Sequence, residues 1–253
     1  MRVLVTSALL ALSAPALACD GDGASLKIVT LNTWGLPSPI APDRSSRLPR
    51  IERWLDEAGV DVAGLQEVWR GALKLLRNPI QTGDPQGDAG LALRSKHPIS
   101  DASVHTFTAE RGIDALKAKG VLSGRVELEN QPMHVAVTHL QSGGGSRNAD
   151  VRARQVDEIL TTVGHDDAPL VLMGDFNFYE DDPTDQRTHD RLLAEGFVDA
   201  AGDLGATRGT YPGLRHRFDR IYVRSRCGVA QSAEVLDAQD LSDHRPVVVD
   251  LTL

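Results

Sequence analysis

The sequence predicts a mixed α/β sandwich in which β-strands form the inner layers and helices lie outside. Short apolar runs of strand length recur along the chain, and in its middle they alternate with segments of helical periodicity. The remaining runs follow one another as antiparallel strands do, which favours layers of sheet and helix around one core. The 253 residues suffice for a single domain, and the sequence contains no internal repeat or interdomain linker.

The expected strands are short runs rich in apolar and β-branched residues, and two of them, 89–94 and 121–128, are expected to be antiparallel. Together the strands cover residues 26–31, 60–65, 89–94, 121–128, 133–138, 170–174, 220–224, 229–235 and 246–253. The first helix carries Pro49 in its opening turn and stops at Gly59. Helices are expected over 44–58, 149–163 and 188–195, with a short helix and polar loop over 71–88 and an acidic loop over 180–185.

The first 18 residues are typical of a secretory signal peptide. Arg2 precedes an uncharged, mostly apolar run that ends in Ala16-Leu17-Ala18, an Ala-x-Ala cleavage pattern. No later stretch approaches the roughly 20 apolar residues of a membrane span. We therefore expect residues 1–18 to be removed, residues 19–253 to form one domain, and the protein to be secreted or periplasmic.

Cys19 would be the first residue of the exported chain, and three interpretations of it remain open. In the first, Cys19 forms a disulfide with Cys227, the other of the two cysteines, as an oxidising compartment allows. In the second it is lipidated, and in the third its thiol is free. A small residue precedes Cys19, but Ala16 is a poor residue for a lipidation signal. Soluble export is therefore favoured, with Cys19 available for a disulfide.

The charge balance argues against broad polyanion binding. The formal net charge is -8 and becomes -9 when Arg2 is removed with the leader, whereas non-specific nucleic-acid affinity comes mainly from Lys and Arg. One stretch is locally basic, and in it only Asp219 opposes the positive charge. Besides His216 it contains Arg208, Arg215, Arg217, Arg220, Arg224 and Arg226.

Polar side chains stand where several expected strands end. Residues 170–174 run into Asp175, and Asn177 follows two positions later. Residues i and i+2 of a strand share a face, so both side chains would present oxygens to one point if the extended conformation continued. The alternative is an ordinary turn, which Gly-Asp and Asn favour. A hard cation or a phosphate is the ligand that such oxygens suit.

Asn32, Glu67 and His139 end other strands in the same way. Alone, each has a structural interpretation as a turn cap, a solvated strand end or a core histidine. Because α/β folds build ligand sites at one edge of a sheet, these ends together predict one shared mouth. Asp219 alternates with apolar residues and shares their inward face, where an unpartnered carboxylate is costly. Asp243-His244 supplies a further carboxylate and a possible partner for Asp219.

Six segments, in order, resemble the motif set of the endonuclease/exonuclease/phosphatase superfamily. They are Leu31-Asn-Thr-Trp34, Leu65-Gln-Glu-Val68, Thr138-His-Leu140, Gly174-Asp-Phe-Asn177, Phe218-Asp-Arg-Ile221 and Ser242-Asp-His-Arg-Pro246. Within it, Asn32-Thr-Trp-Gly-Leu-Pro37, Gln66-Glu-Val-Trp69 and Ser95-Lys-His-Pro98 are most similar to neutral sphingomyelinases and related phosphodiesterases. The resemblance implies a catalytic domain with two mixed, mainly antiparallel sheets packed face to face and helices outside, a four-layer sandwich.

The resemblance also implies a metal-dependent phosphoric ester hydrolase. Asn32 and Glu67 would hold the principal metal, and Asp243 would complete the metal or nucleophile cluster. Asp175 and Asn177 would orient the attacking water and phosphate, and both belong to the implied metal site. Mg²⁺ suits oxygen ligands and substrate phosphate, with Mn²⁺ or another divalent cation as the alternative. The sequence offers no Cys/His cage of the structural-zinc type.

In the implied mechanism His244 is the general base, Asp219 orients it, and His139 donates to the phosphate oxygens. An imidazole suits base catalysis near neutral pH. The favoured function is therefore a secreted phosphodiester hydrolase of sphingomyelinase or phospholipase C type. Trp34 stands where abasic-site-type nucleases carry an acid, which weakens the alternative of a secreted DNase-like endonuclease.

Two further alternatives are a phosphatase acting on phosphoinositides or other phosphomonoesters and a non-catalytic binding module. The expected partner is a phosphodiester substrate, either phospholipid or nucleic acid, and the protein is expected to be a monomer. Transient contact with a membrane surface would use an apolar loop that could equally be packed inside. That loop contains Trp34, Leu36, Pro37, Pro39 and Ile40.

Overall fold

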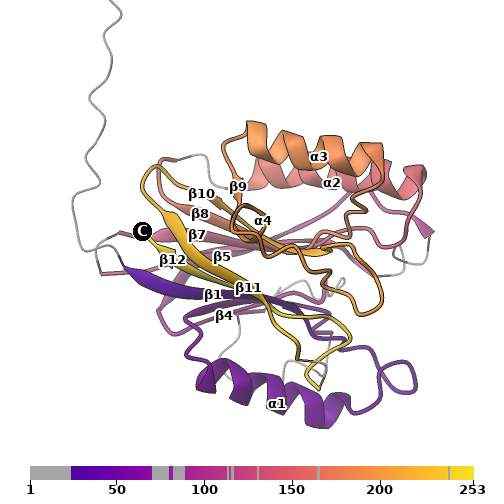
Figure 1. The fold of residues 1–253 in the computed structure, drawn as a ribbon, viewed down its shortest axis with the longest axis horizontal. Helices are drawn as coiled ribbons and strands as arrows, with labels where there is room; N and C mark the ends of the chain where they lie inside the picture. Colours follow the sequence, from indigo (N-terminus) through magenta and orange to yellow (C-terminus); the bar gives the residue numbers. More distant parts are fainter. Residues whose placement is uncertain are drawn as a thin grey trace, which may run out of the picture.

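The structure is a computed structural model that describes residues 24–69, 80–81, 89–112, 114, 117–129, 131–163, 166–238 and 240–253. Within these residues two six-stranded sheets pack face to face, and helices cover the outer faces (Figure 1). The predicted four-layer sandwich is confirmed. The expected signal peptide, Cys19 and most of the segment 71–88 lie outside the described residues. Cys227 is disulfide-bonded.

The first sheet has the strand order β11-β12-β1-β2-β4-β3. Its strands are β1 (Ser25–Asn32), β2 (Val62–Gln66), β3 (Ile80–Gln81), β4 (Ala92–Ser95), β11 (Val229–Val235) and β12 (Val247–Thr252). Strand β1 runs parallel to β2 and antiparallel to β12, so the two ends of the described chain meet in mid-sheet. Helix α1 (Arg44–Glu57) packs Leu48, Ile51 and Leu55 on the outer face.

The second sheet has the strand order β5-β6-β7-β8-β10-β9. Its strands are β5 (Ile99–Thr106), β6 (Gly120–Val126), β7 (Met133–His139), β8 (Leu170–Asp175), β9 (Val198–Asp199) and β10 (Asp219–Arg224). Parallel β7 and β8 set His139 opposite Asp175, and antiparallel β10 sets Asp219 opposite Asp175. Helices α2 (Ser146–Thr162) and α3 (Pro183–Ala194) cover this sheet, and the short α4 (Ala200–Asp203) follows β9 (Figure 1).

The main core lies between the sheets, where Ile28, Val135 and Val249 are fully buried. The sheets approach closely at Gly64 of β2, because a Cβ there would stand 2.8 Å from both the Met173 and the Val137 side chains. A larger residue at this position would force the sheets apart. Close packing therefore keeps the polar ends of β1 and β2 within reach of those of β7 and β8.

Several boundaries differ from the sequence-based expectation. Strands β4 and β6 each lie in antiparallel pairings, as expected, but they belong to different sheets, and β5 was not predicted. Helix α3 begins at Pro183, so the second half of the expected acidic loop is helix. Asp182 caps it by accepting from the Thr184 and Asp185 amides. The Asp-Pro pair was the overlooked signal, because both residues favour helix starts.

Candidate active site

Among the described residues, the polar strand ends open on one cleft of about 410 Å³. The predicted site residues in its lining are Asn32, Glu67, His139, Asp175, Asn177, Asp243 and His244. The predicted shared mouth is therefore present. Asp219 does not line the cleft but contacts His244 from behind.

Asn32, at the end of β1, joins the two sheets across this cleft. Its buried side-chain amide donates to Glu67 Oε1 and to Asp175 Oδ2, both at 3.1 Å. Its Oδ1 accepts from the Trp34 amide at 3.0 Å. The amide thus holds two carboxylates near each other that would otherwise repel.

Glu67 carries the atom that best indicates a cation. Its Oε2 is buried and has no hydrogen-bond partner among the described residues. A buried carboxylate oxygen without a donor is costly. Asn32 and Asp243 add oxygens to the same cleft, a donor set of the kind that hard divalent cations prefer. These residues fit a metal ion.

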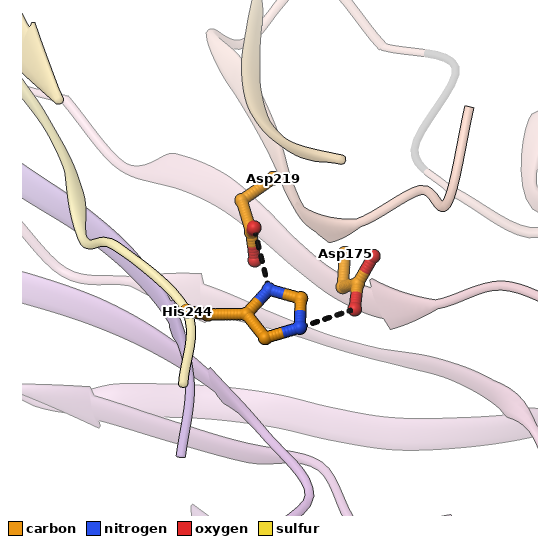
Figure 2. A group of neighbouring side chains, drawn as sticks. All are labelled: Asp175, Asp219 and His244. Atoms are coloured by element: carbon orange, nitrogen blue, oxygen red, sulfur yellow. Dashed lines mark hydrogen bonds and ion pairs between the residues drawn. The ribbon is translucent and has the colours of Figure 1, made fainter. Parts of the chain in front are cut away.

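His244 and Asp219 form a buried imidazole–carboxylate pair, with Nδ1 lying 2.8 Å from Asp219 Oδ2. On the other side of the ring, Nε2 lies 3.9 Å from Asp175 Oδ2 (Figure 2). Burial alone would lower the pKa of His244, but the charges of Asp219, Asp175 and Asp243 raise this pKa to about 10. Burial and the Asp219 charge raise the pKa of Asp175 to about 6.

Ligand-type atoms of Asp175, Asp219 and His244 lie within 4.8 Å of one another, which is also compatible with a bound ion. The hydrogen bond between His244 and Asp219 accounts for this cluster without one. A carboxylate on Nδ1 fixes the imidazole tautomer and directs Nε2 toward the cleft, as a general base requires.

His139 ends β7 with its Nε2 3.5 Å from Asp175 Oδ2. Its Nδ1 is buried and has no partner within the described part of the chain. Burial and the nearby positive charges of Lys119 and His244 hold the pKa of His139 well below its usual value. The neutral ring retains one N–H for a ligand in the cleft.

Strand β8 ends at Asp175, and Asn177 has a φ of 51°, so the extended conformation does not continue. The idea that both side chains share one strand face is therefore wrong. The backbone amide of Asn177 donates to Asp175 Oδ1 at 3.0 Å, and this hydrogen bond stabilises a turn. Both residues still line the cleft. Trp34 and Glu67 also have positive φ, and such strain in non-glycine residues clusters at functional sites.

The cleft also contains residues that the sequence did not single out. Lys119 is 3% exposed, donates to the Leu140 carbonyl at 2.9 Å and lies 3.5 Å from Asp114 Oδ2. Burial lowers its pKa. Tyr211 packs edge-on against His244, with ring centroids 5.1 Å apart. The available signal for Lys119 was its place in a lysine-rich connection directly before a buried strand.

Five of the six arginines of the basic stretch form ion pairs with carboxylates in the folded chain. The pairs are Arg208–Asp237, Arg215–Asp181, Arg217–Glu180, Arg220–Asp199 and Arg226–Asp167. Their acidic partners lie far away in the sequence, so the stretch is basic in sequence but compensated in space. None of these arginines is in the lining of the cleft.

The sequence profile of the Endonuclease/Exonuclease/phosphatase family matches residues 29–244. The chain belongs to this family. The match includes every strand end described above, so the suspected resemblance is confirmed.

Among relatives of this endonuclease/exonuclease/phosphatase chain is human sphingomyelin phosphodiesterase 2, 27% identical over 179 residues. The match covers 62% of this chain and 42% of the human protein, so the chain spans less than half of that relative. A beta toxin variant from Staphylococcus aureus, solved with bound magnesium ions, is 21% identical with a TM-score of 0.71, covering 90% of this chain and 99% of that one.

The fold is also shared with TDP2 from D. rerio, solved with a single-strand DNA product. That structure has a TM-score of 0.74 and 19% identity, and the match covers 91% of this chain and 100% of that one. At such identities the likeness establishes the fold alone.

Proposed function

We propose that the protein is a secreted, divalent-metal-dependent phosphodiester hydrolase of the sphingomyelinase or phospholipase C type. One observation carries the proposal: Asn32 joins Glu67 and Asp175 in the same cleft that is lined by His244, whose ring is held from behind by Asp219. Oxygen ligands for a cation thus stand beside an oriented base. Hydrolysis of a phosphodiester needs both, because the phosphate charge must be neutralised and a water must be activated.

Glu67, Asn32 and Asp243 would hold the metal, with Mg²⁺ as the cation that this oxygen-rich set suits best. When bound, the cation would neutralise phosphate charge and acidify a water. Asp175 and Asn177 position the substrate and the water from the opposite sheet. The magnesium seen in the staphylococcal beta toxin structure supports this assignment.

The pKa of His244 is raised in the site without a cation, and the positive charge of a bound cation would lower this pKa. The neutral imidazole would then take the proton from the attacking water through Nε2, while Asp219 holds Nδ1 and stabilises the imidazolium that forms. His139 donates its remaining N–H to a phosphate oxygen. Lys119, buried in the same wall, adds positive charge where negative charge builds in the transition state.

The apolar rim of the cleft supports a phospholipid substrate and transient membrane contact. Trp34 and Leu36 are half-buried in the lining, whereas Pro37, Pro39 and Ile40 are exposed, Ile40 to 62%. An apolar loop beside the cleft would let the protein rest on a bilayer while it takes one headgroup. Among the described residues no helix combines the length and apolarity needed to span a membrane.

A DNase-like endonuclease is the second candidate, favoured by the shared fold of the DNA-bound TDP2 structure. The paired arginines argue against it, because phosphate contacts would have to displace carboxylates. A non-catalytic module is disfavoured because every predicted catalytic position keeps its functional group. A phosphomonoester phosphatase remains an outcome of the substrate test, and a monomer is the expected state.

The proposal is tested by incubating the purified protein and Mg²⁺ with sphingomyelin or phosphatidylcholine vesicles, phosphoinositides, plasmid DNA and RNA. Release of phosphocholine from vesicles is expected. Cleavage of nucleic acid with no headgroup release supports the nuclease instead, and no turnover of any substrate contradicts a hydrolase.

Export is tested separately by the mass of the mature protein. A chain that begins at Cys19 without a lipid adduct is expected, and retention of residues 1–18 contradicts export by this leader.

A further inference from the structure

A buried ion pair outside the cleft connects helices α2 and α3. Arg152 Nε donates to Asp185 Oδ1 at 2.8 Å, and Nη2 donates to Oδ2 at 2.6 Å. Both side chains have no solvent exposure. Burying two charges is costly, and apolar residues of similar volume can pack two helices as well or better. Helix packing alone therefore does not explain the pair.

The remaining hydrogen bonds of the pair reach the two loops that continue from the cleft. Arg152 Nη1 donates to the carbonyls of Gln141 and Gly143, at 3.0 and 2.8 Å. Asp185 Oδ2 also accepts from the Tyr179 amide at 2.9 Å. Arg152 thus holds the loop after β7, and Asp185 holds the loop after β8.

Each held residue lies close in sequence to a residue of the cleft. Gln141 follows His139 by two positions, and Tyr179 follows Asn177 by two. Gln155, one turn after Arg152 on α2, adds a second anchor, because its Oε1 accepts from the backbone amide of Gln141 at 2.8 Å. The bidentate bond between Arg152 and Asp185 fixes the two anchors relative to each other.

We propose that Arg152 and Asp185 form a positioning unit that sets the spacing of the β7 and β8 loops. His139 and the Asp175–Asn177 turn then act on the same phosphate, with His139 Nε2 3.5 Å from Asp175 Oδ2. This inference rests on the proposed hydrolase function. Neither residue lines the cleft, so they act through the loops rather than on the substrate.

The decisive variant is the double substitution Arg152→Met with Asp185→Leu. It removes both charges together, so no unpaired buried charge remains and the fold should persist. It also removes the three hydrogen bonds to the loops. We expect kcat to fall about 10- to 100-fold, because misplacement of catalytic groups by about 1 Å has effects of this order. KM should change less, since the metal ligands Asn32 and Glu67 belong to the other sheet.

A matched control replaces a charge pair on the opposite side of the sandwich. Arg94 of β4 lies 3.6 Å from Glu52 of α1, and neither residue lines the cleft. Glu52→Leu with Arg94→Met should leave kcat unchanged. A fall in kcat equal to that of the first double variant would show that the loss is a general effect of deleting buried charge.

Amide hydrogen exchange gives a readout that needs no substrate. The Tyr179 amide loses its acceptor in the Arg152→Met, Asp185→Leu variant, so peptides spanning 177–180 and 139–143 should exchange faster than in the wild type. If that variant does not fold, Arg152→Lys provides the test, because a lysine keeps the positive charge but cannot form the bidentate hydrogen bonds of the guanidinium group. Its kcat should fall, and faster exchange should appear in 139–143.

A folded variant with wild-type kcat and unchanged exchange overturns the inference. Failure of the proposed function looks different: the wild-type protein itself turns over no substrate, while the exchange difference between wild type and variant remains.

Discussion

Asn32 of the first sheet donates a hydrogen bond to Asp175 of the second sheet, 143 positions further along the chain, at 3.1 Å. The candidate site therefore straddles the sandwich and depends on both sheets. We expect Asn32→Ala to weaken Mg²⁺ binding and to lower kcat/KM by about 100-fold or more, because Glu67 and Asp175 lose their shared donor and a metal ligand disappears. Titration calorimetry with Mg²⁺ and steady-state kinetics measure the two effects. Wild-type Mg²⁺ affinity in this variant would remove Asn32 from the metal site.

His244→Ala should lower the turnover rate by at least ~100-fold, the lower end of general acid–base contributions. The matched control is His134→Ala, since His134 is paired with Asp166 at the opposite end of β7. That variant should turn over at the wild-type rate. Near-normal turnover by folded His244→Ala protein would show that another group is the base.

Chelation should abolish activity, and added Mg²⁺ or Mn²⁺ should restore it. Because a ligand that binds only the folded state stabilises it, Mg²⁺ should also raise the melting temperature. The Glu67→Gln variant, which weakens the ligand set, should show a smaller rise at the same Mg²⁺ concentration. Full activity in excess chelator would contradict the metal requirement.

The buried Asp199 carboxylate should make the free energy of unfolding depend on pH. Burial alone would raise its pKa, but the charges of Arg220 and Arg217 and a hydrogen bond from the Gly202 amide lower this pKa overall. The folded pKa lies below the unfolded value of about 3.9, so the stabilisation is complete above that pH and is lost as pH falls through the folded pKa.

Urea unfolding of wild type and Asp199→Asn checks this sign. At neutral pH the wild type should have the larger free energy of unfolding. The difference in this free energy between the two proteins should become smaller below about pH 4. A gap of the same size at both pH values would mean that the Asp199 charge does not contribute.

Ile40→Ser should reduce vesicle binding and activity on vesicles while leaving activity on a water-soluble phosphocholine ester unchanged. Ile40 is 62% exposed at the cleft rim, whereas Leu204 is 43% exposed and lies away from the cleft. Leu204→Ser is therefore the control and should bind vesicles as the wild type does. Equal loss on vesicles and on the soluble ester would place Ile40 in the site itself rather than in membrane contact.

The sequence predicts the layers and most strand ends because alternation and apolar runs are local signals. Asp219 illustrates this: its alternation with Ile221 placed it on the inward face, where it meets His244. Local signals do not report partners far away in sequence. For that reason the carboxylates that neutralise the basic stretch were not foreseen, nor was the place of Lys119 in the cleft.

Turn geometry was the second feature that could not be predicted from the sequence. A carboxylate and an amide two positions apart are compatible with a strand face or with a turn, and only the φ of Asn177 distinguishes them. Similarly, Asp182 and Pro183 are typical of both acidic loops and helix starts, and the structure shows the helix.

The topology has a consequence for biosynthesis. The second sheet is formed by one continuous part of the chain between β5 and β10, but the first sheet pairs β1 with β12 and closes only when residues 247–252 are available. The ribosome delivers His244 after all of the second sheet. A nascent chain that has not reached residue 244 therefore lacks part of the candidate site, which can assemble only after that residue has been added.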